Sequence, residues 1–150
     1  MTQNESVTAE RVWFRLVRLN ARLGAAVGDR LKAVGLSVPQ CDVLATLTER
    51  EGVSQQELAE RLYVTKGNIS GLIDRLEAAK LVERRSIAGD RRSHAIYLTE
   101  EGCKLAQRGV EIQRNYVART IGRLAPEQAR QFETLIVAVR DCARQAERED

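Results

Sequence analysis

The sequence contains few of the residues from which metal sites, disulfide frameworks and hydrolytic active sites are built. Its 150 residues include three widely spaced cysteines and a single histidine. This set argues against a disulfide framework and against a closed zinc site within one chain. A nucleophile–base pair, a carboxylate dyad and a glycine-rich phosphate loop are not evident either. We therefore expect no metal, no cofactor and no enzymatic activity.

Long apolar segments and an export signal are also missing. The longest segment free of Asp, Glu, Lys and Arg runs from Ala33 to Cys41 and contains Pro39, so it does not suit a membrane-spanning helix. The first six residues are polar, whereas a signal peptide begins with cationic and then apolar residues. Together with the dispersed cysteines, these absences predict a protein of the reducing cytoplasm with no membrane partner.

Proline and aromatic residues are scarce, at two prolines and 4% aromatics, which favours a mainly helical chain. Hydrophobic residues make up 43% of the sequence, which is enough to bury a core. The 24 basic and 21 acidic residues leave a net charge of +3. The segment 61–94 alone carries +4, because it holds eight Lys and Arg residues and four Asp and Glu residues. Such a segment is a weak indication of an anionic partner.

Apolar spacing and capping residues predict the order of the elements. A long helix covers about 8–34 and carries two apolar stripes and a stripe of arginines. Helices of about 37–52, 54–62 and 66–79 follow, and Ser37 and Ser54 each begin a capping box. Short strands at 81–87 and 95–98 enclose a polar loop, 88–94, and two more helices cover about 99–121 and 126–147. The expected fold is mainly α with a small β-hairpin wing, arranged as a winged helix-turn-helix lobe plus a helical dimerisation lobe.

The helix that begins at Lys66 has the features of a DNA recognition helix. Its inner face is apolar, whereas its outer face carries small and polar residues that suit a major groove. We expect Lys66 to reach a phosphate or a guanine edge and Asn68 to pair with adenine, although both residues also suit an ordinary solvent-exposed helix start. Gly67 and Gly71 would each cost a purely structural helix about 1 kcal/mol against alanine, so they favour close approach of a partner.

The polar loop between the two strands predicts a second DNA contact. We expect Arg92 to enter a narrow minor groove, Asp90 to hold a neighbouring arginine in position, and Arg91 to contact phosphate. A solvated charged turn is the alternative interpretation. The complete set of expected DNA-binding residues is Ser54, Gln55, Thr65, Lys66, Gly67, Asn68, Ser70, Arg75, Arg85, Asp90, Arg91, Arg92 and His94.

Three motifs show a family resemblance. The run from Gly35 to Gly102, and within it Asp90-x-Arg92, Asp74-Arg75-Leu76-Glu77 and Leu98-Thr99-x-x-Gly102, resembles the MarR family of bacterial transcriptional regulators. The resemblance implies one MarR-type domain over residues 1–150, with a dimerisation lobe of about 6–36 and 100–150 and a winged helix-turn-helix lobe of about 37–99. It implies an obligate homodimer that reads a pseudo-palindromic operator in double-stranded DNA. It also implies a ligand pocket between the two lobes.

A small organic molecule is the expected signal. We expect a repressor released by such a ligand, for example an aromatic acid or a phenol, with Trp13, Arg15, Arg18, Asn20, Arg22 and Cys41 as candidate ligand-binding residues. Cys41 departs from the family, in which this position is commonly aromatic. Its place near a helix start would lower a thiol pKa and favour a redox-responsive regulator, whereas a small core residue is the other interpretation. A DNA-binding protein without a ligand and a helical module that binds protein also stay open.

Overall fold

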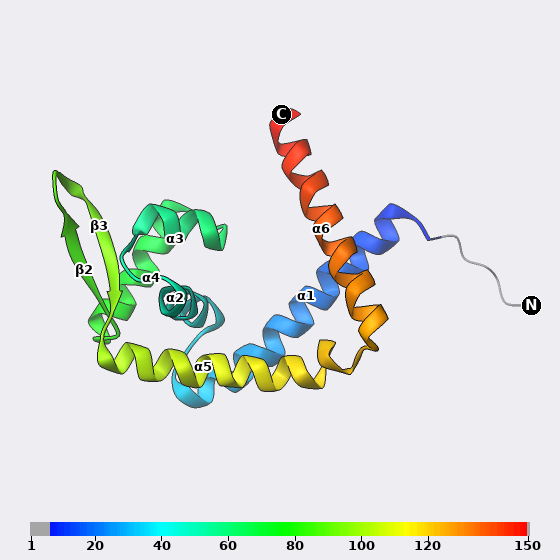
Figure 1. Cartoon of the computed structure of the whole chain (residues 1–150), viewed down its shortest axis with the longest axis horizontal. Helices are drawn as coiled ribbons and strands as arrows, with labels where there is room; N and C mark the ends of the chain where they lie inside the picture. Colours follow the sequence, from blue (N-terminus) through cyan, green and yellow to red (C-terminus); the bar gives the residue numbers. More distant parts are fainter. Residues whose placement is uncertain (1–6, 150) are drawn as a thin grey trace, which may run out of the picture. The chain divides into compact units, whose positions relative to one another are not determined.

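The computed structural model describes residues 7–149 (Figure 1). Its elements are α1 (Ala9–Leu31), η1 (Lys32–Val34), α2 (Val38–Glu49), β1 (Val53–Ser54), α3 (Gln55–Leu62), α4 (Lys66–Ala78), β2 (Val82–Ile87), β3 (Asp90–Leu98), α5 (Glu100–Arg119), η2 (Ile121–Arg123) and α6 (Pro126–Glu149). The predicted fold class is confirmed, since the chain is mainly helical and its strands form a small antiparallel sheet. Within the described residues no helix is both long and apolar enough to cross a membrane.

Side chains that cap helix ends fix where the helices begin. Ser37 and Gln40 form the predicted capping box of α2: the Ser37 amide donates to Gln40 Oε1 at 3.0 Å and the Gln40 amide donates to Ser37 Oγ at 3.3 Å. Ser54 and Glu57 repeat the arrangement at α3, at 2.9 and 3.1 Å. Thr65 caps α4 by accepting from the Asn68 amide at 3.2 Å. These caps place α3 and α4 on either side of a short turn, as predicted.

The sheet differs from the predicted hairpin in two ways. Its order is β1–β3–β2, because the two-residue strand β1, which was not predicted, pairs with Ile96 and Ala95 of β3. The second strand begins at Asp90 and not at Ala95, so the predicted polar loop was too long. The register shifts after the pair Ser86–His94, and the next pair is Ile87–Asp90. Residues 91–93 therefore form a bulge in β3, and only residues 88 and 89 lie between the strands.

The chain divides into two compact units, and the division falls within α5, between residues 112 and 113. The first unit holds the core, which lies where α2, α3 and α4 pack with the sheet, the end of α1 and the start of α5. Its largest fully buried side chains are Leu31, Leu44, Leu47, Leu58, Ile69, Ile73, Leu76, Ile96, Val43, Val53, Val82 and Cys41. The second unit contains the rest of α5, η2 and α6, and α6 has no buried residue.

The Leu98-Thr99-x-x-Gly102 motif joins the sheet to α5. The Thr99 amide donates to the Leu81 carbonyl at 3.0 Å, and the Thr99 hydroxyl donates to the Lys80 carbonyl at 2.7 Å. The same hydroxyl accepts from the Gly102 amide at 3.0 Å and so caps α5. A Cβ at Gly102 would collide with the Leu81 carbonyl, so only glycine lets α5 begin this close to the end of α4.

Candidate nucleic-acid interface

The exposed face of α4 has two glycines along its centre and polar side chains at its edges. Ile69, Leu72, Ile73 and Leu76 are buried and fix which side of α4 faces the core. By the helical period, Gly67 and Gly71 lie on the opposite side. A Cβ built on either glycine meets no other atom within 4 Å, so neither glycine is required by packing inside the chain.

The polar residues expected to contact DNA flank these two glycines. Thr65, Lys66, Asn68 and Arg75 are exposed, and Ser70 is half-buried. The outer face of α4 therefore offers a backbone strip that a groove can approach closely, with hydrogen-bonding side chains on both sides.

The wing carries its arginines on the bulge of β3. Asp90 Oδ1 accepts from the Arg92 amide at 2.9 Å, and Asp90 Oδ2 accepts from the Ser93 hydroxyl at 2.7 Å. The Ser93 hydroxyl first and then the Arg92 amide hold the pKa of Asp90 below its ordinary value. Asp90 thus shapes the backbone that carries Arg92, through a bond to the Arg92 amide. Arg91 and Arg92 are both exposed.

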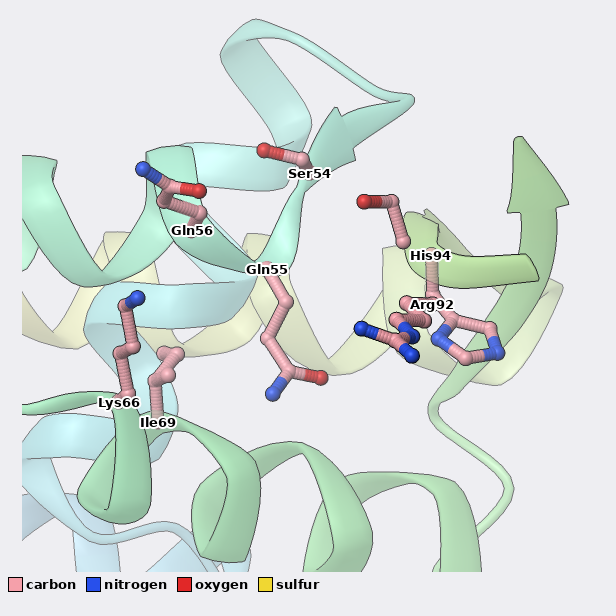
Figure 2. Close-up of a pocket in the computed structure, with 8 residues that line it drawn as sticks. Ser54, Gln55, Gln56, Lys66, Ile69, Arg92 and His94 are labelled. Atoms are coloured by element: carbon pink, nitrogen blue, oxygen red, sulfur yellow. The ribbon is translucent and has the colours of Figure 1, made fainter. Parts of the chain in front are cut away.

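A pocket of about 220 Å³ brings the recognition helix, the start of α3 and the wing together (Figure 2). Two lining side chains, Lys66 and Arg92, are cationic, and no carboxylate lines the pocket among the described residues. A concave surface of this kind suits a phosphate-bearing strand. We call it the wing groove, and it is lined by Ser54, Gln55, Gln56, Lys66, Ile69, Arg92, Ser93 and His94.

The wing groove thus gathers five of the expected DNA-binding residues: Ser54, Gln55, Lys66, Arg92 and His94. Others lie elsewhere on α4 and the wing, including Asn68, Arg75 and Arg91. Arg85 is held apart, because its guanidinium lies 4.0 Å from the centroid of the Tyr97 ring and 3.3 Å from a Glu83 oxygen. These two contacts occupy Arg85 on the outer side of the sheet.

Arg84 of β2, which was not predicted from the sequence, connects α3 and α4 to the sheet. Its side chain is 17% exposed, and its guanidinium donates to Asp74 at 2.6 Å and to Glu77 at 2.7 Å. It also donates to Gln55 Oε1 at 3.3 Å and to the Ser70 carbonyl at 3.4 Å. Partial burial opposes the charge, but the bonds to both carboxylates raise the pKa of Arg84.

Strand alternation contained the signal for this role. Successive side chains in a strand point to opposite faces, so Arg84 shares the face of buried Val82 and lies opposite the face of Arg85. A charged residue on the buried face of a strand needs a partner, and Asp74 and Glu77 of α4 supply it.

The candidate ligand residues do not form one cluster. Trp13, Arg15, Arg18, Asn20 and Arg22 are all exposed along α1, and Trp13 is 61% exposed. Cys41 is fully buried, and a Cβ added to Gly109 of α5 would lie 2.7 Å from its sulfur. Burial first, and the charge of Asp42 second, raise the pKa of Cys41 to about 11. The interpretation in which the start of α2 lowers this pKa is wrong, because burial removes the hydration that a thiolate needs.

Comparison with known proteins gives one consistent result. A sequence model described as the MarR family matches residues 34–93. The chain is 32% identical over 123 residues to the HTH-type transcriptional repressor Rv2887 of Mycobacterium tuberculosis, which covers 82% of this chain and 88% of that protein. The crystal structure of AbsC, a MarR family transcriptional regulator from Streptomyces coelicolor, superposes with a TM-score of 0.84 at 26% identity, covering 95% of this chain and 99% of that one. Rv2887 crystallised with salicylic acid gives a TM-score of 0.67 at 29% identity, over 90% and 98% of the two chains.

Proposed function

The chain belongs to the MarR family of transcriptional regulators, and we propose that it acts as a homodimeric repressor that a small aromatic acid releases from a pseudo-palindromic operator. The observation that carries the proposal is the wing groove, where two cationic side chains from separate elements face one concave surface. Because the proposed partner is chromosomal DNA, we expect the protein to act in the cytoplasm.

In the proposed complex, α4 lies in the major groove and the wing in the flanking minor groove. Lys66 and Asn68 contact base edges. Thr65, Ser70 and Arg75 contact the DNA backbone and position α4 in the groove. Arg92 enters the minor groove, whose narrow A·T-rich form attracts a weakly hydrated guanidinium. Arg91 and His94 contact phosphates, and Gly67 and Gly71 allow the backbone of α4 to approach the bases.

The proposed dimer is supported by apolar surface that one chain leaves exposed. On α1, Trp13 and Phe14 are 61% and 58% exposed, and on α6, Leu135 and Ile136 are 64% and 50% exposed. Exposed apolar faces on two long helices are typical of an obligate interface. We assign the occupant as a second copy of the chain, with the dimerisation lobe at about 6–36 and 100–150 and the winged lobe at about 37–99.

The proposed ligand class combines an aromatic ring with a carboxylate. Salicylic acid is present in a crystal structure of the Rv2887 protein. In this chain, Trp13 could stack on an aromatic ring and Arg15, Arg18 and Arg22 could bind a carboxylate. An apolar hollow between α1 and α2, lined in part by Gly28, Lys32 and Val38, is a second place for the same chemistry.

Selection of duplexes from a random-sequence pool tests DNA binding and identifies the operator sequence in one experiment. We expect the purified protein to enrich a pseudo-palindrome whose half-sites lie about one helical turn apart, roughly 34–36 Å. Failure to enrich any duplex, or affinity that does not depend on salt, would reject the proposal and favour a module that binds protein.

Salicylate added to the protein–duplex complex tests the ligand. We expect it to raise the melting temperature of the free protein and to lower its affinity for the selected duplex. A raised melting temperature with unchanged DNA affinity would reject the coupling. A DNA-binding protein without a ligand would show neither effect with any of a panel of aromatic acids.

A further inference from the structure

Gln55 occupies a central position in the wing groove. It is the first residue of α3 and is half-buried, and its side chain extends between α4 and the wing. Figure 2 shows its amide between Lys66 and Ile69 on one side and Arg92 and His94 on the other. Its neighbour Gln56 is exposed and lines the same groove.

Arg84 determines which way the amide of Gln55 faces. Arg84 Nε donates to Gln55 Oε1 at 3.3 Å. A guanidinium has only donors, so the amide atom that faces it must be the oxygen and cannot be the nitrogen. Figure 2 shows the nitrogen on the side of Lys66 and Ile69. Gln55 therefore presents N–H donors to the groove.

The orientation of Arg84 is itself fixed. Its guanidinium is held by Asp74 and Glu77 and by the Ser70 carbonyl, all from α4. Its own amide donates to Glu77 Oε1 at 3.3 Å. Rotation of the Gln55 amide would therefore place its NH2 group against the N–H of Arg84 Nε, and the bonds to α4 prevent the guanidinium from rotating to avoid this.

Gln56 is oriented the opposite way. Its Nε2 donates one hydrogen to Glu60 Oε1 at 3.2 Å, and a carboxylate can only accept, so the amide nitrogen of Gln56 faces Glu60. The two adjacent glutamines are thus held by opposite ends of their amides, Gln55 by its oxygen and Gln56 by its nitrogen.

We propose that the Gln55 amide donates a hydrogen bond to a DNA phosphate oxygen and that Arg84 is the positioning residue that makes it a donor. The proposal rests on the DNA-binding function proposed above. A phosphate is favoured over a base edge because Gln55 opens the first helix of the helix-turn-helix, which crosses the DNA backbone. The cations of Lys66 and Arg92 in the same groove favour the same anion.

The test measures binding of a fluorescein-labelled duplex, enriched with the wild-type protein, and of a scrambled duplex, across a salt series. Gln55→Met keeps the length of the side chain and removes the donor. We expect it to weaken binding to both duplexes about tenfold, the usual size for a hydrogen bond to a charged group. The salt slope should not change, because a neutral amide displaces no counterion, whereas Arg91→Met, which removes a proposed phosphate contact, should reduce the slope by about one per wing.

Three further variants sharpen the result. Gln55→Glu keeps the bond to Arg84 but presents an acceptor, so it should lose more affinity than Gln55→Met. Gln56→Met should lose clearly less, because its amide nitrogen lies against the Glu60 carboxylate, whose negative charge repels a phosphate. Gln107→Met, an exposed glutamine on α5, is the inert control. Unchanged affinity for Gln55→Met overturns the contact, and a loss confined to one base pair of the enriched duplex overturns the assignment to phosphate.

A double-mutant cycle tests the role of Arg84. Arg84→Lys keeps a cation for Asp74 and Glu77 but has no fork to orient Gln55. We expect Arg84→Lys to weaken binding about as much as Gln55→Met, and the double variant to be little weaker than either single one. Additive losses would overturn the positioning role. If the wild-type protein enriches no duplex, the proposed function fails; if it binds and the variants bind equally well, only this inference fails.

Discussion

At the scale of single residues, Asp90 shows how one carboxylate can organise a DNA-binding wing. Its two oxygens accept from the Arg92 amide and the Ser93 hydroxyl, and these bonds span the bulge in β3. The carboxylate replaces ladder hydrogen bonds that a bulge cannot make. Arg92 is therefore presented from a defined backbone, which reduces the entropy lost when its side chain enters a groove.

The wing prediction concerns Asp90, Arg91 and Arg92. Arg92→Ala should weaken binding more on duplexes with A·T-rich flanks than on those with G·C-rich flanks, because the narrow minor groove is the more negative. Asp90→Ala should resemble a partial Arg92→Ala, and the two losses should be non-additive. Arg91→Ala is the control, with similar losses on all sequences and a salt slope reduced by about one per wing. Equal losses for Arg92→Ala on both flanks would mean that the wing reads charge alone.

Cys41 gives a prediction about pH and reactivity. Burial raises its pKa from 9.0 to about 11 in the folded chain, so the folded state favours the neutral thiol. The contribution of Cys41 to the free energy of unfolding is therefore fully present below pH 9. It is lost as the pH rises toward 11, because the unfolded chain releases the thiol proton first. Chemical unfolding across this range should show a steeper fall for the wild-type protein than for Cys41→Ala, in which the other alkaline titrations remain.

The thiol of Cys41 should also resist alkylation at neutral pH until the chain unfolds, because the thiolate is the reactive form. Exposed Cys142 serves as the internal reference for reagent access. Rapid modification of Cys41 in the folded protein would contradict the buried position and reopen the redox interpretation.

Residues whose role depends on near neighbours in the sequence could be predicted, and others could not. Ser37, Ser54 and Thr65 cap helices through partners three residues away, so the spacing alone identified them. Arg84 meets carboxylates seven and ten residues away on another element. Its role follows from tertiary packing, which a local pattern does not contain.

At the scale of elements, α4 places two glycines where packing does not require them. Gly67→Ala and Gly71→Ala should each raise the free energy of unfolding by up to about 1 kcal/mol, because alanine is the better helix former and no atom obstructs its methyl group. Both should weaken DNA binding, since the added methyl groups separate α4 from the groove. Thermal unfolding checks the expected gain in stability, and duplex binding measured on the same samples checks the expected loss of affinity.

Gly102→Ala is the matched control for this pair. Its methyl group would meet the Leu81 carbonyl, so it should lower stability by about 1–3 kcal/mol, as overpacking does. If Gly67→Ala and Gly71→Ala lower stability as Gly102→Ala does, packing inside the chain requires these glycines. If they leave DNA binding unchanged, close approach of the groove does not require them.

Most element boundaries were predictable, while the sheet was not fully so. Helix starts carried caps, but β1 has only two residues and β3 begins with the polar run Asp90-Arg-Arg-Ser-His94. These residues have little intrinsic preference for strands, and they extend because β2 offers an edge to pair with. The same pairing places Arg92 and His94 in the wing groove, so the strand start was predicted wrongly although both residues were expected to contact DNA.

At the scale of the whole molecule, the exposed apolar faces of α1 and α6 predict a dimer. Sedimentation of the purified protein should show a dimer at low micromolar concentration. Leu135→Glu should favour the monomer, because it places a charge among apolar neighbours. Glu133→Gln lies nearly opposite on α6 by the helical period and should remain dimeric. A stable, folded wild-type monomer would contradict the dimer.

The contacts at Thr99 and Gly102 connect the start of α5 to the DNA-binding elements, so a movement of α5 would also move those elements. Two short hydrogen bonds from Thr99 attach the start of α5 to Lys80 and Leu81, between α4 and β2, so a tilt of α5 would be passed on to the recognition helix and the wing. A helix of 20 residues is about 30 Å long, and a tilt of about ten degrees moves one end by roughly 5 Å relative to the other. A displacement of that size is comparable to the rise of one and a half base pairs. A ligand that tilts α5 slightly could therefore put two recognition helices out of register with their grooves without disturbing a single residue that contacts DNA.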